Sequence, residues 1–318
     1  MAEPNRVQWR RRLADNSTAL AFIGLLALCI AMSFVSDRFW TWDNLSNVAR
    51  QVSINAIIAT GMTIVILTGG IDLSVGAVMT LSMTFAAGAM LAHLPVPVAV
   101  LIGLATGAAF GALNGMLIGY ARLPAIIVTL ATMEIPRGIA LLYTGGYPQS
   151  GLPESFAFFG RGQILGLQMP ILIMLVVFAA AFVLLRYFPT GRYFYGLGGN
   201  EEAVRLSGVR VERYKLLAYT LSGLTAAISG IVLSSRLMSG QPNAGIGFEL
   251  DAIAAVVLGG TAITGGRGSI VGTLIGAMTL GVLNNGLNLM SVSPYTQKVL
   301  KGVIILLAIY AGSFKRNR

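Results

Sequence analysis

The amino-acid sequence predicts an all-α integral membrane protein with about ten transmembrane helices. Of the 318 residues, 55% are hydrophobic, only 11% are charged, and 39 are glycine. Soluble domains carry about 25% charged residues, so this composition is typical of a helical membrane protein. The apolar runs are long, as at 170–185, and the alternating strands of an outer-membrane barrel do not occur. We therefore expect a bundle of helices that crosses the membrane repeatedly.

Ten apolar segments account for the chain from residue 19 onward. The first follows the basic stretch RVQWRRR, but no small-residue cleavage pattern precedes the aromatic cluster SDRFWTWDN. We therefore interpret it as a membrane helix with an interfacial belt and not as a signal peptide. The second segment is interrupted and the eighth is short, which makes these two the weakest. The expected crossings are 19–36, 48–67, 74–92, 97–119, 124–142, 169–187, 214–235, 250–263, 269–290 and 297–313.

Ten crossings place both termini on the same side of the membrane. Most of the 22 Lys and Arg residues then fall on that side, so the positive-inside rule makes both termini cytoplasmic. Residues 1–18 form the cytoplasmic N-terminal segment, and 188–213 form a cytoplasmic loop. The net charge of +10 is explained by this placement next to membrane lipid, and we expect no nucleic-acid partner.

A weak internal duplication relates 107–143 to 277–310. A Gly-x-Leu-Asn motif ends at Asn114 in the first copy and at Asn284 in the second, and a proline follows each asparagine ten residues later. The predicted topology makes the two copies inverted, as in many transporters whose path lies at the repeat interface. We expect one transmembrane domain, 1–318, with 48–143 and 214–313 as inverted halves.

Glycines recur every four residues along the fourth segment, from Gly103 to Gly119, and again from Gly268 to Gly276. Small residues let helix backbones approach closely in lipid, where no hydrophobic force draws helices together. These positions are predicted to pack tightly.

Two stretches are predicted to break helices: LTGGIDLSVG at 67–76 and LGGTAITGGRGS at 258–269. Irregular backbone at membrane depth needs protein or water around it, so both breaks should line a cavity or face the cytoplasmic mouth. Asp72 either caps a helix that begins near Leu73 or contacts a substrate or partner at that mouth. Arg267 is expected at the mouth or as an anchor at the cytoplasmic surface.

Few polar residues lie within the apolar segments. An asparagine amide both donates and accepts, which suits sugar hydroxyls along a path and equally suits bridges between helices. The candidates for a substrate path are Asn114, Asn284, Asn285 and Asn288. Glu134 and Arg137 are expected to pair with each other or to reach the outer surface, and no series of acids suggests a proton relay.

The sequence lacks the residues for chemistry of its own. No phosphate-binding G-x-x-x-x-G-K-[S/T] motif occurs, since none of the four lysines follows a glycine, so the chain is expected to bind no ATP and no other cofactor. One histidine and one cysteine cannot assemble a metal site. We expect that the protein is not an enzyme.

The stretch GLGGNEEAVRLSGV at 196–209 concentrates charge that is rare elsewhere in the chain. Asn200 is a good helix N-cap, Glu201 and Glu202 suit the positive end of a helix, and Gly208 is a natural stop. A two-turn helix is unstable in water, so it must lean on something. It is either pushed by a soluble motor or is a solvated loop helix, amphipathic through Ala203, Val204 and Leu206. Arg205 and Ser207 complete this predicted helix, which comprises residues 200–208.

Four blocks resemble the permease subunits of bacterial ATP-binding-cassette sugar importers, in the branch that contains the ribose permease. They are SINAIIATGMTIVILTGGIDLSVGAVMTL (53–81), GRYFYGLGGNEEAVRLSGVRVERYK (191–215), GFELDAIAAVVLGGTAITGGRGSIVGTLIGA (247–277) and GVLNNGLNLM (281–290). The resemblance implies an inner-membrane protein that imports ribose or a related sugar. It also implies that 200–208 is the coupling helix.

The resemblance further implies three kinds of partner. A cytoplasmic ATPase subunit would bind ATP and Mg, and a second permease chain, identical or paralogous, would complete the pore. A periplasmic sugar-binding protein would deliver the sugar and contact Arg236, Glu249 and Asp251.

Two other function classes stay open. An ion-coupled secondary sugar transporter would also have inverted repeats and broken helices, but intramembrane carboxylates are too few and the short polar helix has no role there. An intramembrane enzyme lacks a convincing nucleophile, and a scaffold needs no polar path.

Overall fold

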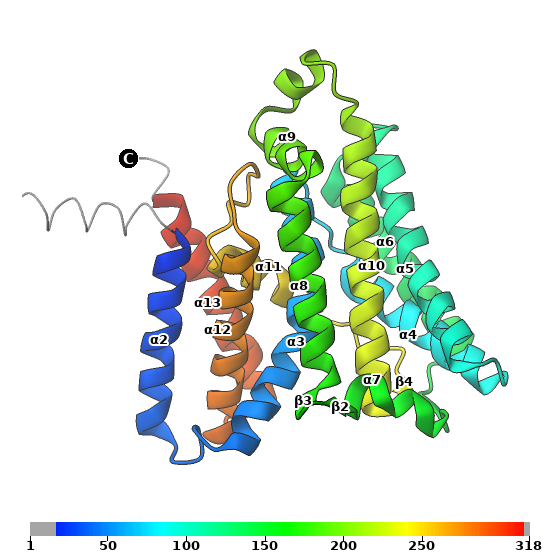
Figure 1. Cartoon of the computed structure of the whole chain (residues 1–318), viewed down its shortest axis with the longest axis vertical. Helices are drawn as coiled ribbons and strands as arrows, with labels where there is room; N and C mark the ends of the chain where they lie inside the picture. Colours follow the sequence, from blue (N-terminus) through cyan, green and yellow to red (C-terminus); the bar gives the residue numbers. More distant parts are fainter. Residues whose placement is uncertain (1–16, 315–318) are drawn as a thin grey trace, which may run out of the picture.

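Each of the ten predicted segments contains a helix, as Figure 1 shows. The computed structural model describes residues 17–314, so most of the predicted N-terminal segment 1–18 and the last four residues lie outside the described residues. The ten helices are α2 (Ser17–Val35), α3 (Trp42–Leu67), α4 (Val75–Leu91), α5 (Val96–Gly119), α6 (Ala125–Thr144), α8 (Met169–Tyr187), α10 (Val211–Leu237), α11 (Phe248–Leu258), α12 (Ile270–Leu289) and α13 (Pro294–Phe314).

Seven helices of the described chain are long and apolar enough to cross a membrane: α2, α3, α5, α6, α8, α10 and α12. The prediction of an all-α membrane protein is therefore confirmed. Large apolar side chains cover the outside of the bundle, as expected for a surface that meets lipid. Figure 1 places α9 (Pro189–Leu206), the first turn of α2 and the end of α13 at the same end of the bundle. We call this end the α9 end.

The opposite end carries short elements. β1 (Gln149–Ser150) pairs antiparallel with β4 (Ser239–Gly240), and β2 (Gln163–Ile164) pairs antiparallel with β3 (Leu167–Gln168). Between them lie η1 (Glu154–Ala157) and α7 (Phe158–Arg161). These elements close the end of the bundle remote from α9 (Figure 1).

The eighth segment is not a continuous helix across the membrane. α11 has 11 residues and so spans about 16 Å, roughly half of a bilayer core. The preceding residues 241–247 run beside α4 instead, where the Gly245 N–H donates to the Thr80 hydroxyl at 2.9 Å. Gly247, with φ of +92°, turns the chain into α11. The expected helix at 250–263 thus begins two residues early and ends five residues early.

The tightest packing joins α5 to α10. The α5 glycines predicted to pack closely do so: a Cβ at Gly115 would lie 2.6 Å from the Leu216 Cα, and a Cβ at Gly111 would strike the Tyr219 carbonyl oxygen. The neighbours are backbone atoms, which cannot move aside. α3 and α4 pack on the same α10, and the C-terminal half of α3 and nearly all of α4 are buried.

α5–α6 and α12–α13 are both pairs of helices joined by a short connection. Pro124 precedes α6 and Pro294 begins α13, and α5 and α12 run in opposite directions in Figure 1. This arrangement agrees with inverted copies, and the division into halves at 48–143 and 214–313 stays a prediction.

Candidate functional site

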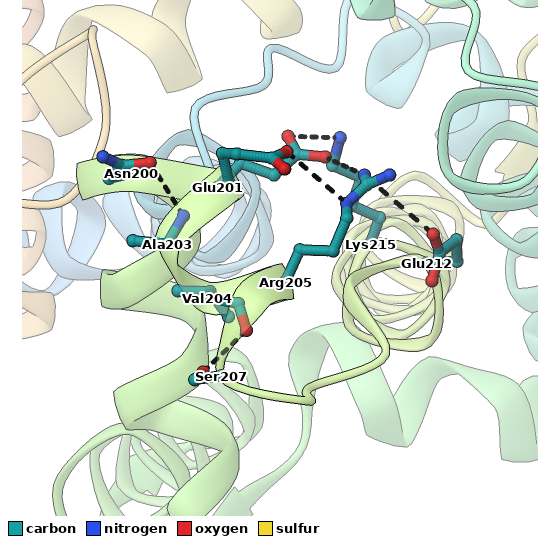
Figure 2. Close-up of polar contacts among 9 residues, drawn as sticks. Asn200, Glu201, Ala203, Val204, Arg205, Ser207, Glu212 and Lys215 are labelled. Carbon is teal, nitrogen blue, oxygen red and sulfur yellow. Dashed lines mark hydrogen bonds and ion pairs between the residues drawn. The ribbon is translucent and has the colours of Figure 1, made fainter.

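The predicted short helix at 200–208 exists and is capped at both ends. α9 contains a kink at Asn200, whose φ of −158° and ψ of 97° are not helical. The Asn200 Oδ1 accepts a hydrogen bond from the Ala203 N–H at 3.0 Å, which is the geometry of an N-cap (Figure 2). Gly208 ends the helix with φ of +85°, and its N–H donates to the Arg205 carbonyl. We call residues 200–208 the coupling segment.

One face of the coupling segment is tied to α10 by ion pairs. The Lys215 Nζ lies 2.7 Å from the Glu201 Oε2, and the Arg205 guanidinium lies 3.0 Å from the Glu201 Oε1. Arg205 also lies 3.9 Å from carboxylate oxygens of Glu202 and Glu212 (Figure 2). Each partly exposed pair contributes about 0.2–1 kcal/mol, and the network as a whole fixes the orientation of the segment on α10.

The other face of the coupling segment is open. Glu202, Ala203, Leu206 and Ser207 are exposed, and Leu206 exposes 80% of its surface. The expectation of one apolar face through Ala203, Val204 and Leu206 is wrong in part, because only Val204 turns inward, toward Gly196. The segment lies at the extreme end of the bundle (Figure 1), and there Leu206 is exposed.

A second helix, residues 189–199, supports the coupling segment. Sequence reasoning placed the whole of 188–213 in a loop, although Pro189 at a helix start and the apolar residues after it were a usable signal. Phe194 and Leu197 of this helix are buried. Gly198 lies so close to the Leu67 carbonyl oxygen and the Gly266 amide that no side chain would fit there. The coupling segment therefore rests on both helix breaks.

The two predicted breaks meet at the α9 end. The Gly266 N–H donates to the Leu67 carbonyl at 3.1 Å, so each break satisfies part of the other's backbone. Gly69 and Gly70 line a small cavity of about 210 Å³ together with Glu201 of the coupling segment. Arg267 is exposed at this end, as an anchor or mouth residue would be.

Asp72 does not line a mouth in this structure, because it is buried with 1% of its surface exposed. Its Oδ1 accepts from the Ser74 N–H and hydroxyl, at 3.0 and 2.6 Å, and its Oδ2 accepts from the Ser222 hydroxyl at 2.8 Å. Asn114, predicted in the substrate path, is equally buried and donates to the Ser74 hydroxyl at 2.9 Å. A buried carboxylate needs such partners, so both residues connect α4, α5 and α10. The helix begins at Val75, two residues later than expected.

A larger cavity of about 400 Å³ lies between α3, α10, α11 and α12, in the half of the bundle remote from α9. We call it the outer cavity. Asn55 and Asn284 each have a buried amide oxygen without a hydrogen-bond partner among the described residues. The polar residues that line it are Gln51, Asn55, Arg236, Asp251 and Asn284.

Two of the predicted path asparagines serve as helix bridges. Asn285 exchanges two hydrogen bonds with Asn44 of α3, at 2.7 and 3.0 Å. The Asn288 Oδ1 accepts from the Gln297 amide at 2.8 Å and so joins α12 to α13. Of the four asparagines, only Asn284 lines the outer cavity.

The three predicted contacts of a binding protein separate in the structure. Arg236 and Asp251 line the outer cavity, and the Lys301 Nζ lies 2.9 Å from the Asp251 carboxylate. Glu249 lies in the first turn of α11, is 9% exposed, and packs its side chain against Gly76 of α4. Its negative charge suits the positive N-terminal end of α11. Glu249 is therefore buried in this structure, and its contact with a binding protein stays a prediction.

Comparisons with known proteins agree with these features. A family model described as branched-chain amino acid transport system / permease component matches residues 44–309. The ribose import permease of Escherichia coli (strain K12) is 49% identical over 300 residues, which cover 93% of this chain and 94% of the relative.

Two further relatives also match over 90% or more of their length. The ribose import permease of Bacillus subtilis (strain 168) is 49% identical over 290 residues, covering 91% of this chain and 90% of the relative. The xylose transport system permease of E. coli (strain K12) is 37% identical, and the match covers 93% of this chain and 92% of the relative. No solved structure matches the chain. The chain therefore belongs to this permease family, in the branch that contains the ribose import permeases of ATP-binding-cassette importers.

Proposed function

We propose that this chain is the permease subunit of an ATP-binding-cassette importer that carries ribose or a closely related monosaccharide into the cytoplasm. The support for ribose is the 49% identity to permeases named for ribose import, against 37% to one named for xylose. Their similarity extends over more than 90% of this chain, so it includes the membrane helices and the coupling segment.

The observation that carries the mechanism is the coupling segment. Its inner face is held on α10 by Glu201, Arg205 and Lys215, while Leu206 on its outer face is 80% exposed. A rigid helix whose inner face is fixed on α10 and whose outer face is exposed can transmit the movement of a docked protein to α10. We propose that a cytoplasmic ATPase subunit, with ATP and Mg bound to it, docks on the outer face, which places the α9 end and both termini in the cytoplasm.

The assignment of Glu201 and Arg205 is refined by this geometry. Their charges are already engaged within the chain, so their role is to position the segment. Contact with the ATPase falls to Glu202, Ala203, Leu206 and Ser207. An apolar side chain that becomes buried in a groove contributes about 1.5–3 kcal/mol, which makes Leu206 the strongest candidate for an anchor.

The outer cavity is the proposed place where the sugar enters the path. Its side chains supply amide donors and acceptors and one charge of each sign, a set that suits the hydroxyls of a neutral sugar. It lies toward the end remote from the coupling segment, where a periplasmic sugar-binding protein would dock. Arg236 and Asp251 would then meet the sugar, while the surface around α7 and the β-strands would meet the binding protein.

The test is a substitution in the outer face of the coupling segment. Leu206→Asp should weaken binding of the cognate ATPase subunit about 10-fold or more, because it removes an apolar anchor and adds a charge. The melting temperature of the permease alone should not change, since Leu206 is 80% exposed. Co-purification with the ATPase and sugar uptake are the measurements.

The matched control is Leu165→Asp, because Leu165 is 99% exposed in the turn between β2 and β3, at the opposite end. This variant should bind the ATPase normally. Normal ATPase binding by Leu206→Asp would refute the proposed docking face, and sugar uptake that persists without any ATPase would favour an ion-coupled transporter.

A further inference from the structure

Several hydrogen-bond donors border the small cavity at the α9 end, and within the described residues they are not all used. The cavity has a volume of about 210 Å³, and we call it the inner cavity. It lies between the first helix break, the connection from α5 to α6 and the coupling segment. A water molecule occupies about 30 Å³ of the liquid, so the inner cavity has room for a molecule of several atoms.

Tyr219 of α10 directs an unpartnered hydroxyl at the inner cavity. The residue is 1% exposed, and its hydroxyl has no hydrogen-bond partner among the described residues. The hydroxyl lies against Gly70, where a Cβ would strike it, and both residues line the cavity. A buried hydroxyl without a partner is unfavourable, and a ligand that bonds to it would remove that cost.

Lys215, one turn before Tyr219 on α10, contributes a cation to the lining. Its Nζ lies 2.7 Å from the Glu201 Oε2 (Figure 2), and this is its only ion pair within residues 17–314. An ammonium group has three donors, so others remain for a ligand. The Glu201 carboxylate is shared with Arg205, whose guanidinium lies 3.0 Å from the Glu201 Oε1, so it does not fully neutralise the ammonium.

The N-terminus of α6 borders the same cavity. Pro124 and Ala125 line it, and no side chain caps the helix. The first α6 N–H that bonds within the described chain is that of Val128, which donates to the Pro124 carbonyl at 3.1 Å. The N–H groups of residues 125–127 therefore stay available, and the helix dipole adds partial positive charge there.

The acid next to the inner cavity is already engaged elsewhere. Asp72 accepts hydrogen bonds from Ser74 and Ser222 and does not line the cavity. The groups left over are thus an ammonium, a hydroxyl and a helix N-terminus, and this combination favours an anion.

We propose that the inner cavity binds a phosphate group, either as free phosphate or as the headgroup of an anionic membrane lipid. The tetrahedral oxygens of a phosphate can accept from Lys215, from the Tyr219 hydroxyl and from the start of α6 at the same time. The bound group then joins α6 to α10 directly beside the coupling segment. The inference rests on the proposed function only for the cytoplasmic setting of the α9 end, and not on the identity of the sugar.

Equilibrium dialysis of the full-length permease against radiolabelled inorganic phosphate tests the free-phosphate source. The permease is kept in a non-ionic detergent that carries no phosphate, so that no headgroup competes, and we expect a single saturable site. In a second sample, phosphatidylglycerol replaces the inorganic phosphate. Native mass spectrometry then measures whether the permease retains this lipid, which tests the headgroup source.

Two variants test the residues that line the site. Tyr219→Phe removes only the unpartnered hydroxyl, and Lys215→Met removes the ammonium. Each should weaken binding about 10-fold, because a hydrogen bond to a charged group is lost. The matched control is Tyr187→Phe, which should bind normally, because Tyr187 is 72% exposed at the end of α8 and does not line the cavity. Without phosphate, an unchanged or higher melting temperature of Tyr219→Phe shows that this variant is folded.

The two samples distinguish the sources. Inorganic phosphate that binds the permease and is lost in both variants supports a site for free phosphate. Phosphatidylglycerol that is retained and lost in the same way, without binding of inorganic phosphate, supports a headgroup site. The proposal is overturned if neither ligand binds, if Tyr219→Phe or Lys215→Met binds as tightly as the unchanged chain, or if Tyr187→Phe loses as much. None of these results affects the docking test at Leu206, which does not line the cavity, so the two proposals fail separately.

Discussion

The coupling segment and the outer cavity differ in how their polar groups are satisfied. At the α9 end, Glu201, Arg205 and Lys215 each lie within 4 Å of an opposite charge, and the two helix breaks bond to each other. In the outer cavity, Asn55 and Asn284 each keep a buried amide oxygen with no partner in the described chain. The ion pairs hold the coupling segment in one orientation. The amide oxygens of the cavity keep the capacity to accept further hydrogen bonds.

The α5–α10 contact joins these two regions, and its disruption should have the largest effect. Gly111→Leu would force a side chain into the Tyr219 backbone, and overpacking of this kind costs about 1–3 kcal/mol or more. The melting temperature of the purified permease should fall, and uptake should fall with it. Gly24→Leu on α2 is the control, because no atom lies within 4 Å of its Cβ position. An unchanged melting temperature for Gly111→Leu would show that the contact is not tight.

Two neighbouring asparagines sharpen the comparison at the outer end. Asn285→Leu removes a reciprocal pair of hydrogen bonds and leaves Asn44 unpaired, so it should destabilise the permease by about 1–3 kcal/mol. Asn284→Leu removes an amide oxygen that has no partner within residues 17–314, so the melting temperature should stay the same or rise. The same variant should reduce sugar uptake, because a lining residue of the cavity is lost.

Thermal melting and uptake, measured side by side on both variants, separate these roles. Equal destabilisation by Asn284→Leu and Asn285→Leu would mean that the Asn284 side chain is as firmly bonded as that of Asn285. Normal uptake by Asn284→Leu would remove the outer cavity from the sugar path.

The smallest effect is expected from one ion pair of the coupling segment. Lys215→Met removes one of the two cations that pair with the Glu201 carboxylate, and the lost ion pair is worth about 1 kcal/mol or less in a partly exposed position. The segment should then lie less firmly on α10, and the number of sugar molecules imported per ATP hydrolysed should fall. The control is Lys298→Met, since Lys298 has no ion pair among the described residues. If Lys215→Met and Lys298→Met import the same number of sugar molecules per ATP hydrolysed, the ion pairs do not hold the coupling segment in place.

The sequence alone determined the helix content, the seven described helices that are long and apolar enough to cross a membrane, and the caps of the coupling segment. Apolar length fixes whether a helix can span lipid, and capping depends on residues a few positions apart, so both are local properties. The glycine spacing of α5 was sufficient to predict its close packing, because a face of small residues lets any neighbouring helix approach closely.

Only the tertiary structure decided which polar residues face a cavity. Asn284 and Asn285 are adjacent in the sequence and identical in type, yet one lines the outer cavity and the other binds Asn44, more than 200 residues away. Likewise Asp72 and Glu249 carry charges that the sequence placed at surfaces, and the fold buries them. The role of an amide or a carboxylate depends on what the opposite helix presents, and pairings between distant helices are not encoded in local spacing.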